Sequence, residues 1–207
     1  MPAAIWFTGL PGSGKSALAR AVCQYLKLAG GDVALLELDD RRKHYFPKPT
    51  YSEGEREKAY KLFTEEAAGL YRKHTGLVVM DASAPRRAMR DYARSLMPHF
   101  AEIHVRCSLA TAMAREAARP EGKVMAGLYA KAMMRKATGR EFPGLGQVIG
   151  VDVPFEEDPE AECVVDAEHL SIEGCRDAVL SFLRAWLPET LAPRLDLPAP
   201  DDAPEPA

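Results

Sequence analysis

The sequence predicts a three-layer α/β fold with a mostly parallel five-stranded sheet. Short apolar runs alternate along the chain with amphipathic stretches of helix length, which is the pattern of consecutive βαβ units. One of these runs, Leu77-Val78-Val79-Met80, is apolar at every position. A strand buried on both faces of a parallel sheet is expected to read in this way.

Local signals support the individual elements. The expected strands cover residues 4–8, 33–38, 77–80, 102–106 and 162–165, and the expected helices cover residues 15–29, 52–73, 85–97, 108–119 and 171–187. Gly30 and Gly31 suit the end of the first helix. Ser52 with Glu55 fits a capping box at the start of the second, and Pro85 suits the first turn of the third.

Composition excludes several classes of function. The 207 residues, 47% apolar and 28% charged, are typical of one globular domain, which we place at residues 1–187. The net charge of −3 gives no basis for nucleic-acid binding, and no apolar run is long enough to cross a bilayer. We expect a cytoplasmic protein without nucleic-acid or membrane partners. The four cysteines form no CxxC pair, so we expect reduced thiols.

The last 20 residues differ from the rest of the chain. Residues 188–207 contain six prolines, five acidic residues and one basic residue. Such a composition cannot bury an apolar core. We therefore expect a disordered tail after residue 187.

The segment that follows the first expected strand matches the pattern GxxxxGK[ST] at every fixed position and opens the first expected helix. Glycines let backbone N–H groups turn toward phosphates, and the helix N-terminus adds the positive end of its dipole. Lys15 is expected to reach the β- and γ-phosphates, and Ser16 to offer its hydroxyl to Mg²⁺. The sequence therefore predicts a P-loop NTPase domain of the nucleotide-kinase type that binds ATP and Mg²⁺. Its expected nucleotide site is Gly9, Leu10, Pro11, Gly12, Ser13, Gly14, Lys15, Ser16 and Ala17.

Two absences narrow the class of P-loop protein. A GTPase reads its base with an Asn-Lys-x-Asp motif, and this chain contains no asparagine. No signature of a transporter-type ATPase is present, and the chain has no room for an oligomeric motor module. These observations favour a kinase that acts on a nucleotide or another small molecule.

Carboxylates follow two of the expected strands. Asp39 and Asp40 come at the end of the second strand, and the carboxyl edge of a parallel sheet is where ligands bind. We expect Asp39 to orient an acceptor hydroxyl or to hold a Mg²⁺-bound water, with Asp40 the less favoured candidate. Asp81 ends the third strand, where it is equally consistent with a metal-supporting Walker B carboxylate and with a cap of the following helix.

A basic segment predicts a helical lid over residues 115–147. Residues 115–140 hold seven Lys or Arg against two Glu, a balance of 7 − 2 = +5 in an acidic chain. Positive groups closing over a triphosphate stabilise charge in the transition state and exclude water. Among them we favour Arg115 as a catalytic residue and then Arg119. Phe142 offers a flat apolar face on which a base can stack.

In these motifs the chain resembles the adenylylsulfate (APS) kinase family over residues 5–166. The P-loop TGLPGSGKS is similar to the family's TGLSGAGKS. The family's D-G-D-x-x-R resembles residues 37–42, F-S-x-x-x-R resembles residues 51–56, and S-P-Y-R-x-x-R resembles residues 84–90. Residues 127–132 are similar to the lid motif K-G-L-Y-x-K-A, residues 142–144 to F-T-G, and residues 151–156 to D-x-P-Y-E.

The resemblance implies roles for particular residues. It places the family's proposed catalytic aspartate on Asp39 and its substrate-binding arginines on Arg42 and Arg56. It places a lid contact on Lys131, and on Phe142 the ring that stacks on the substrate's adenine. It further implies phosphorylation of the 3′-hydroxyl of APS by ATP, a role in sulfate assimilation, and a homodimer.

Three departures from the family pattern fall mostly at the acceptor side. The family's asparagine after F-S-x-x-x-R falls on Ala59, residues 46–50 replace a leucine-glycine segment, and an insertion separates Arg115-Glu116 from Gly127. They leave other acceptors open: another nucleotide, such as a cytidine diphosphoramidate-type substrate, or another small molecule. A non-catalytic nucleotide-binding module is the remaining alternative.

Overall fold

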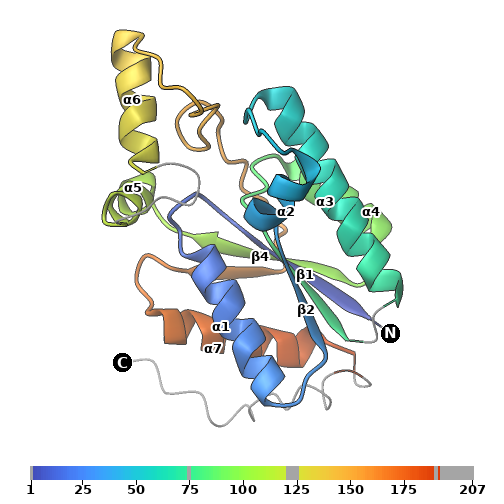
Figure 1. Ribbon diagram of the computed structural model, residues 1–207. Helices are drawn as coiled ribbons and strands as arrows, with labels where there is room; N and C mark the ends of the chain where they lie inside the picture. The colour runs from blue at the N-terminus through green and yellow to red at the C-terminus, as the bar shows by residue number, and fades with distance from the viewer. Residues whose placement is uncertain (1, 74–75, 120–125, 189–190, 192–207) are drawn as a thin grey trace.

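The computed structural model describes residues 2–73, 76–119, 126–188 and 191. One sheet has the strand order β2-β3-β1-β4-β5, and all of its strand pairs are parallel (Figure 1). The strands are β1 (Ala3–Thr8), β2 (Val33–Glu37), β3 (Leu77–Asp81), β4 (Phe100–Arg106) and β5 (Cys163–Asp166). The predicted α/β class and the five-stranded sheet are confirmed.

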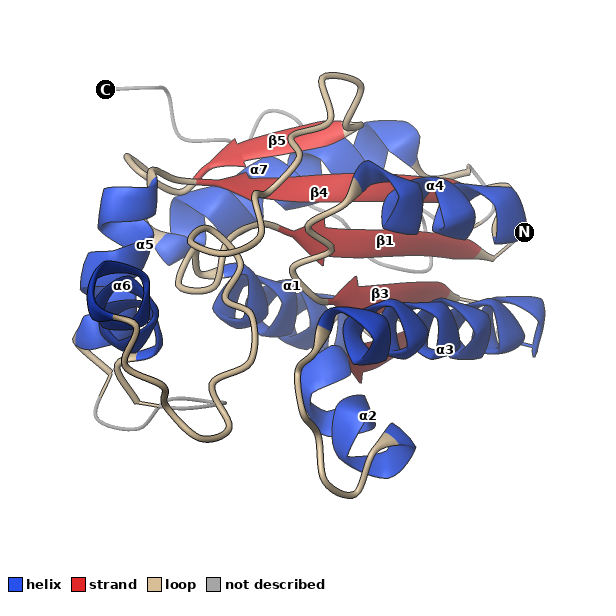
Figure 2. Ribbon diagram, turned by 90° about the horizontal axis from the view of Figure 1, so that it is seen from above, coloured by secondary structure: helices blue, strands red, loops and turns tan. Residues whose placement is uncertain are grey.

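Helices cover both faces of this sheet. They are α1 (Lys15–Leu28), α2 (Leu38–Tyr45), α3 (Glu53–Lys73), α4 (Arg87–Leu96), α5 (Leu109–Ala117), α6 (Leu128–Thr138) and α7 (Ile172–Trp186). Helices α1 and α7 lie on one face, and α3 and α4 lie on the other (Figures 1 and 2). Helices α5 and α6 stand together beyond the carboxyl ends of the strands (Figure 2).

The central strand β1 joins the two layers of core. All six of its residues are buried, and they alternate between the faces as the pleat requires. Ile5 and Phe7 pack with α1 and α7, whereas Ala4 and Trp6 pack with α3 and α4. The ring of Trp6 lies 5.8 Å from that of Phe63 and 6.1 Å from that of Tyr60. These apolar contacts on both faces fix the position of β1, and hence of its carboxyl end, between the two helical layers.

Several local expectations are refined. The acidic turn after the second strand is a helix, α2, in which Asp39 and Asp40 occupy the first turn, where carboxylates favour the helix dipole. Helix α4 begins at Arg87, so Pro85 precedes it. A capping box would use the N–H of Ser52, but Glu55 accepts from the N–H groups of Tyr51 and Thr50, one and two residues earlier.

The end of the first helix is as expected. Gly30 has a φ of +83°, the N–H of Gly30 donates to the carbonyl of Lys27, and the N–H of Gly31 donates to that of Leu26. This is the hydrogen-bond pattern with which many helices end on glycine.

The expected tail is described only at its start. Leu191 is 2% exposed and packs in the same apolar cluster as α1 and α7. Residues 189–190 and 192–207 lie outside the described residues. Among the helices that the structure describes, none has the length and apolar character needed to cross a membrane.

A buried ion cluster lies beneath the sheet on the side of α4. The guanidinium of Arg90 lies 3.2 Å from the carboxylate of Glu102, and both side chains are fully buried. The Thr8 hydroxyl donates to the same carboxylate over 2.6 Å. Arg90 also donates to the backbone carbonyls of Ala84 and Glu156. The cluster therefore ties the connection between α6 and β5, which we call the return segment (residues 139–162), to the sheet.

Removing one partner of this buried pair is expected to be costly. Glu102→Ala leaves Arg90 buried without its counter-charge, so we expect a loss of about 3–5 kcal/mol in the free energy of unfolding. Urea denaturation measures it. As a control, Glu53→Ala removes one of the two carboxylates that Arg86 contacts, at a site where the Glu53 side chain is 54% exposed, and should cost at most about 1 kcal/mol. Equal losses in the two variants would contradict this account.

Candidate functional site

The P-loop connects β1 to α1 and its shape depends on close backbone contacts. Gly9, Gly12 and Gly14 have φ values of +135°, +90° and +99°, a region that favours glycine. A Cβ on Gly12 would lie 2.3 Å from the carbonyl oxygen of Ala112 in α5. The Lys15 ammonium donates to the carbonyl of Leu10 over 3.2 Å. The lysine is thereby held across the mouth of the loop.

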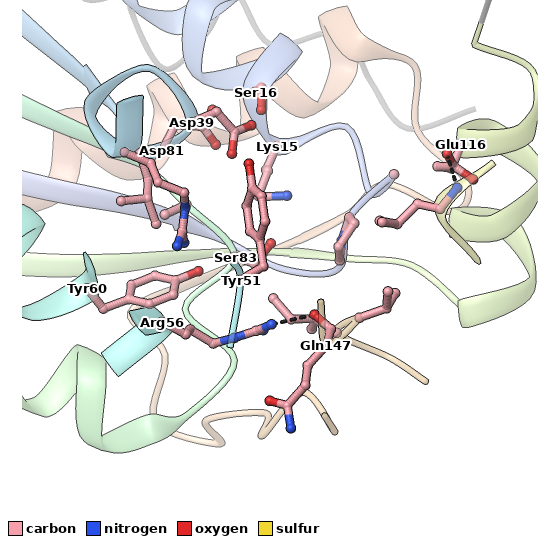
Figure 3. A pocket seen from close by; sticks show the side chains of 18 of the residues that line it. Lys15, Ser16, Asp39, Tyr51, Arg56, Tyr60, Asp81, Ser83, Glu116 and Gln147 are labelled. Atoms are coloured by element: carbon pink, nitrogen blue, oxygen red, sulfur yellow. Dashed lines mark hydrogen bonds between the residues drawn. The ribbon is translucent and has the colours of Figure 1, made fainter. Parts of the chain in front are cut away.

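A cavity of about 150 Å³ opens beside the P-loop (Figure 3). Its apolar wall comprises Leu38, Leu128, Leu145, Val148 and Ile149. The polar side chains on its lining are Lys15, Ser16, Asp39, Arg42, Tyr51, Arg56, Tyr60, Asp81, Ser83, Glu116, Arg119 and Gln147. These residues come from α1, from α2, from α3 and the loop before it, from the carboxyl end of β3, from α5 and α6 with the residues that flank them, and from the return segment.

One side of the cavity is acidic. Asp39 in α2 and Asp81 at the end of β3 lie on the side of Ser16 (Figure 3). Two carboxylates and a hydroxyl are hard oxygen donors, which suit Mg²⁺ when phosphate oxygens and water complete its shell. No group of three or more His, Cys, Asp or Glu side chains in the described part of the chain could hold a metal without such help. The donor set therefore fits Mg²⁺ that arrives with a nucleotide.

The other side is basic and buried. Arg42 and Arg56 are each 6% exposed, and the Nε atom of each has no partner among the described residues. Arg42 lies 3.4 Å from Glu55, and Arg56 donates to the backbone carbonyl of Gln147. Burial, and to a lesser degree the positive charge of Arg42, lowers the pKa of Arg56. Two buried guanidinium groups that line one cavity form a site suited to an anion.

Tyr51, in the loop before α3, lines the basic side of the cavity. Its φ is +55°, unusual for a residue other than glycine, and the Arg42 guanidinium lies 4.9 Å from the centre of its ring. The N–H of Gln147 donates to the Tyr51 carbonyl over 3.3 Å. A Cβ on Gly146 would lie 2.4 Å from the Tyr51 Cβ. The return segment thus holds Tyr51 in place.

A second hollow, of about 290 Å³, lies against the P-loop on the side of Arg115. Arg115 donates to the carbonyl of Ser13 over 3.3 Å and to the carbonyl of Ala167 over 2.7 Å. Its guanidinium thus bridges the P-loop to the segment after β5. Arg119 lines both this hollow and the cavity.

Comparison with known proteins decides the family. A model of the adenylylsulphate kinase family matches residues 1–166, which is most of the chain. The chain belongs to the adenylylsulphate kinase family. A probable adenylyl-sulfate kinase of Archaeoglobus fulgidus is 34% identical over 164 residues, which are 79% of this chain and 95% of that protein. The adenylyl-sulfate kinase of Geotalea uraniireducens is 34% identical over 185 residues, 88% of this chain and 80% of that protein.

Solved structures share the fold. The Mycobacterium tuberculosis APS kinase CysC, determined in complex with AMPPNP and APS, has a TM-score of 0.72 at 24% identity and covers 88% of this chain and 98% of its own. A gluconokinase from Sinorhizobium meliloti has a TM-score of 0.56 at 21% identity, over 89% of this chain and 93% of its own. The family and the kinase class expected from the motifs are confirmed. At these identities the structures themselves support the fold alone.

Helix α6 of this adenylylsulphate kinase family member is joined to the P-loop by a hydrogen bond. The Tyr129 hydroxyl in α6 donates to the Pro11 carbonyl over 2.8 Å. The Glu116 carboxylate in α5 accepts from the N–H of Leu128 over 2.9 Å and so joins α5 to α6. Gly150 of the return segment has left-handed φ and packs close to the Tyr129 ring.

The structure separates the expected site residues into two groups. Pro11, Gly12, Gly14, Lys15, Ser16, Asp39, Arg42, Arg56 and Asp81 lie together on the cavity. Gly9, Leu10, Ser13, Ala17, Arg115, Lys131 and Phe142 do not line it. Phe142 packs against the apolar cluster that includes Ala112 of α5 and Tyr129 of α6, with Arg140 over its ring, and Lys131 is half-buried in α6. Lys123, one of the seven basic residues counted between residues 115 and 140, lies outside the described residues.

Sequence reasoning missed the wall that the return segment forms. Leu145, Val148 and Ile149 carry no chemical motif, and Gln147 is an isolated polar residue. Tyr60 was also missed, although it lies one helical turn after Arg56 and hence on the same face of α3. That spacing is the signal that could have revealed it.

The contact between Gly12 and α5 gives a testable prediction. Gly12→Ala combines an unfavourable φ with a clash against backbone, so we expect ATP affinity to fall tenfold or more, from about 1–3 kcal/mol of strain. Equilibrium titration with ATP·Mg²⁺ measures it. The control is Gly30→Ala, where φ is also positive but nothing lies within 4 Å. That variant should lose about 1 kcal/mol of stability and bind ATP normally. Unchanged ATP affinity in Gly12→Ala would contradict the prediction.

Proposed function

We propose that this kinase transfers the γ-phosphoryl group of ATP to the 3′-hydroxyl of adenylylsulfate, giving 3′-phosphoadenylylsulfate and ADP. The observation that carries the proposal is a single cavity in which the P-loop and Asp39 face two buried arginines. Family membership supports the same acceptor. The acceptor needs an anionic group for Arg42 and Arg56 and a hydroxyl within reach of Asp39, and adenylylsulfate has both.

The donor half of the site binds ATP through the P-loop. Backbone N–H groups of residues 9–16 and the N-terminus of α1 would surround the phosphates. Lys15 would neutralise charge on the β- and γ-phosphates. Ser16, with Asp39 and Asp81 acting through water, would hold Mg²⁺, which neutralises phosphate charge when bound. Arg115 would stabilise the donor side from its position between the P-loop and Ala167.

The acceptor half positions the nucleophile. Arg42 and Arg56 would bind the phosphosulfate group, and Asp39 would orient the 3′-hydroxyl and accept its proton. The hydroxyl oxygen forms a new bond to the γ-phosphorus while the bond from that phosphorus to the β–γ bridging oxygen breaks, and ADP leaves with that electron pair. The lid helices would exclude water that otherwise competes as an acceptor. Lys131 and Phe142 would reach the substrate only after movement of the lid.

A second candidate acceptor is another nucleotide that carries an anionic group, such as a cytidine diphosphoramidate-type substrate. The observation in its favour is Ala59, which is fully buried within the apolar cluster of α3 and α4. Position 59 therefore offers no polar contact to any acceptor. A screen of nucleotide acceptors separates the two candidates.

We also infer from the family resemblance a homodimer, a cytoplasmic location, and one catalytic domain over residues 1–187 with its lid at about residues 115–147. Light scattering on the purified chain would measure the oligomeric state. These inferences are independent of the acceptor.

Release of ADP tests the proposed reaction. With ATP·Mg²⁺, adenylylsulfate should stimulate ADP release by the intact chain, and Asp39→Asn should lower that rate by about 10²–10⁴-fold because the group that accepts the proton is lost. The matched control is Asp40→Asn in the same helical turn, where the side chain is 65% exposed and pairs with Lys43. It should retain full activity.

Two results would count against the proposal. Absence of stimulation by adenylylsulfate would reject the acceptor and direct the search to other nucleotides. Full activity in Asp39→Asn would reject the role of that residue while leaving the acceptor in place.

A further inference from the structure

Tyr60 places a phenol hydroxyl on the lining of the acceptor cavity. The residue lies in α3, and its ring is 4% exposed and packs 6.1 Å from that of Trp6. Figure 3 shows the hydroxyl pointing inward, on the same side of the cavity as Arg56. The ring therefore packs in the apolar core, whereas the hydroxyl lies on the wall of the cavity.

The hydroxyl is fixed in position as a hydrogen-bond acceptor. It accepts from the backbone N–H of Ala84 over 2.9 Å. Ala84 is itself fully buried, has a φ of +46°, and its carbonyl accepts from Arg90 over 3.1 Å. Arg90 of the buried ion cluster thus fixes Ala84, and the N–H of Ala84 in turn fixes the Tyr60 oxygen. A donor that is prepositioned in this way binds a ligand without further loss of side-chain freedom.

The proton of this hydroxyl has no acceptor in the described part of the chain. A phenol can donate once while it accepts, and the bond with Ala84 uses only its accepting capacity. Burial raises the pKa of Tyr60, so the hydroxyl keeps its proton at neutral pH. An oxygen of a ligand bound in the cavity can accept this proton and complete the hydrogen bonding of the phenol.

The neighbours of Tyr60 define the chemistry of that ligand. The charges of Arg56 and Arg42 are both near enough to act on the pKa of Tyr60, in the direction opposite to burial. Each arginine has an Nε atom without a partner among the described residues. All three side chains line the same cavity, so an anionic group with several oxygens bound there would meet two guanidinium groups and the phenol hydroxyl.

We propose that Tyr60 is a substrate-contacting, specificity-determining residue whose hydroxyl donates a hydrogen bond to the anionic oxygens that Arg42 and Arg56 bind. The inference builds on the proposed function, because it concerns the acceptor of the same site. It also explains how the site can lack a polar side chain at position 59. Ala59 is buried in the core, and the adjacent Tyr60 supplies the polar contact instead. The contact favours acceptors with a phosphosulfate or similar oxyanion over neutral acceptors.

Two tyrosine variants on the same helix test this role. Tyr60→Phe keeps the ring and removes the hydroxyl. Tyr71→Phe is its matched control, because Tyr71 lies three turns later in α3, is 8% exposed, and its hydroxyl accepts from the backbone N–H of His99 over 3.1 Å. Both variants lose one bond to a backbone N–H, so their losses of thermal stability should be similar. Only Tyr60 lies on the cavity.

Steady-state kinetics separate binding from structure. In Tyr60→Phe the KM for adenylylsulfate should rise about tenfold to a hundredfold, the effect of one hydrogen bond to a charged oxygen, while the KM for ATP stays constant. In Tyr71→Phe both constants should match those of the intact chain. An unchanged KM for adenylylsulfate in Tyr60→Phe, or an equal rise in both variants, would overturn the proposal.

A binding measurement distinguishes failure of this inference from failure of the proposed function. With ADP·Mg²⁺ filling the P-loop, inorganic sulfate is titrated into each protein and thermal stability is followed. Tyr60→Phe should weaken sulfate binding about tenfold, and Tyr71→Phe should leave it unchanged. This result would support the role of Tyr60 even where adenylylsulfate gives no turnover. Equal sulfate affinity in all three proteins, or no saturable binding to the intact chain, would reject it.

Discussion

The burial of β1 at the centre of a parallel sheet is the constraint on which the rest of the structure depends. With β3 on one side and β4 on the other, β1 has apolar core on both faces. The strand that follows β1 in sequence lies beyond β3, and β4 lies on the opposite side, so the connections diverge at the carboxyl end of β1. A crevice forms where connections diverge in this way. The P-loop begins at that point.

The two halves of the proposed site, the donor half at the P-loop and the acceptor half at Arg42 and Arg56, differ in how they are built. The donor half is local, because the loop after β1, the helix that follows it, and the carboxylates after β2 and β3 all meet at one edge of the sheet. The acceptor half is assembled at long range. Arg56 contacts Gln147 across 91 residues, and Tyr51 is held by the same return segment. Acceptor selectivity therefore depends on the position of a loop that no single secondary-structure element controls.

The buried ion cluster gives this loop its support. Arg90 contacts Glu102 in the sheet, and it also holds the carbonyls of Ala84 and Glu156. Arg94 adds contacts of 3.2 Å to Asp158 and 3.1 Å to Glu162. Such a cluster contributes little net stability, because burying the charges offsets their attraction. Its directional contacts instead specify where the return segment crosses the sheet, and hence where the acceptor cavity has its wall.

The sequence by itself determined the α/β class, the places of the five strands, the P-loop and the grouping of Lys15, Ser16, Asp39 and Asp81. These follow from spacing, because carboxyl ends of parallel strands must meet at one edge. The α2 helix, the wall from residue 145 to 149 and the inward hydroxyl of Tyr60 were decided only by tertiary structure. They depend on contacts between segments that are distant in the sequence. Neither hydrophobic periodicity nor local secondary-structure propensity predicts which distant segments will come into contact.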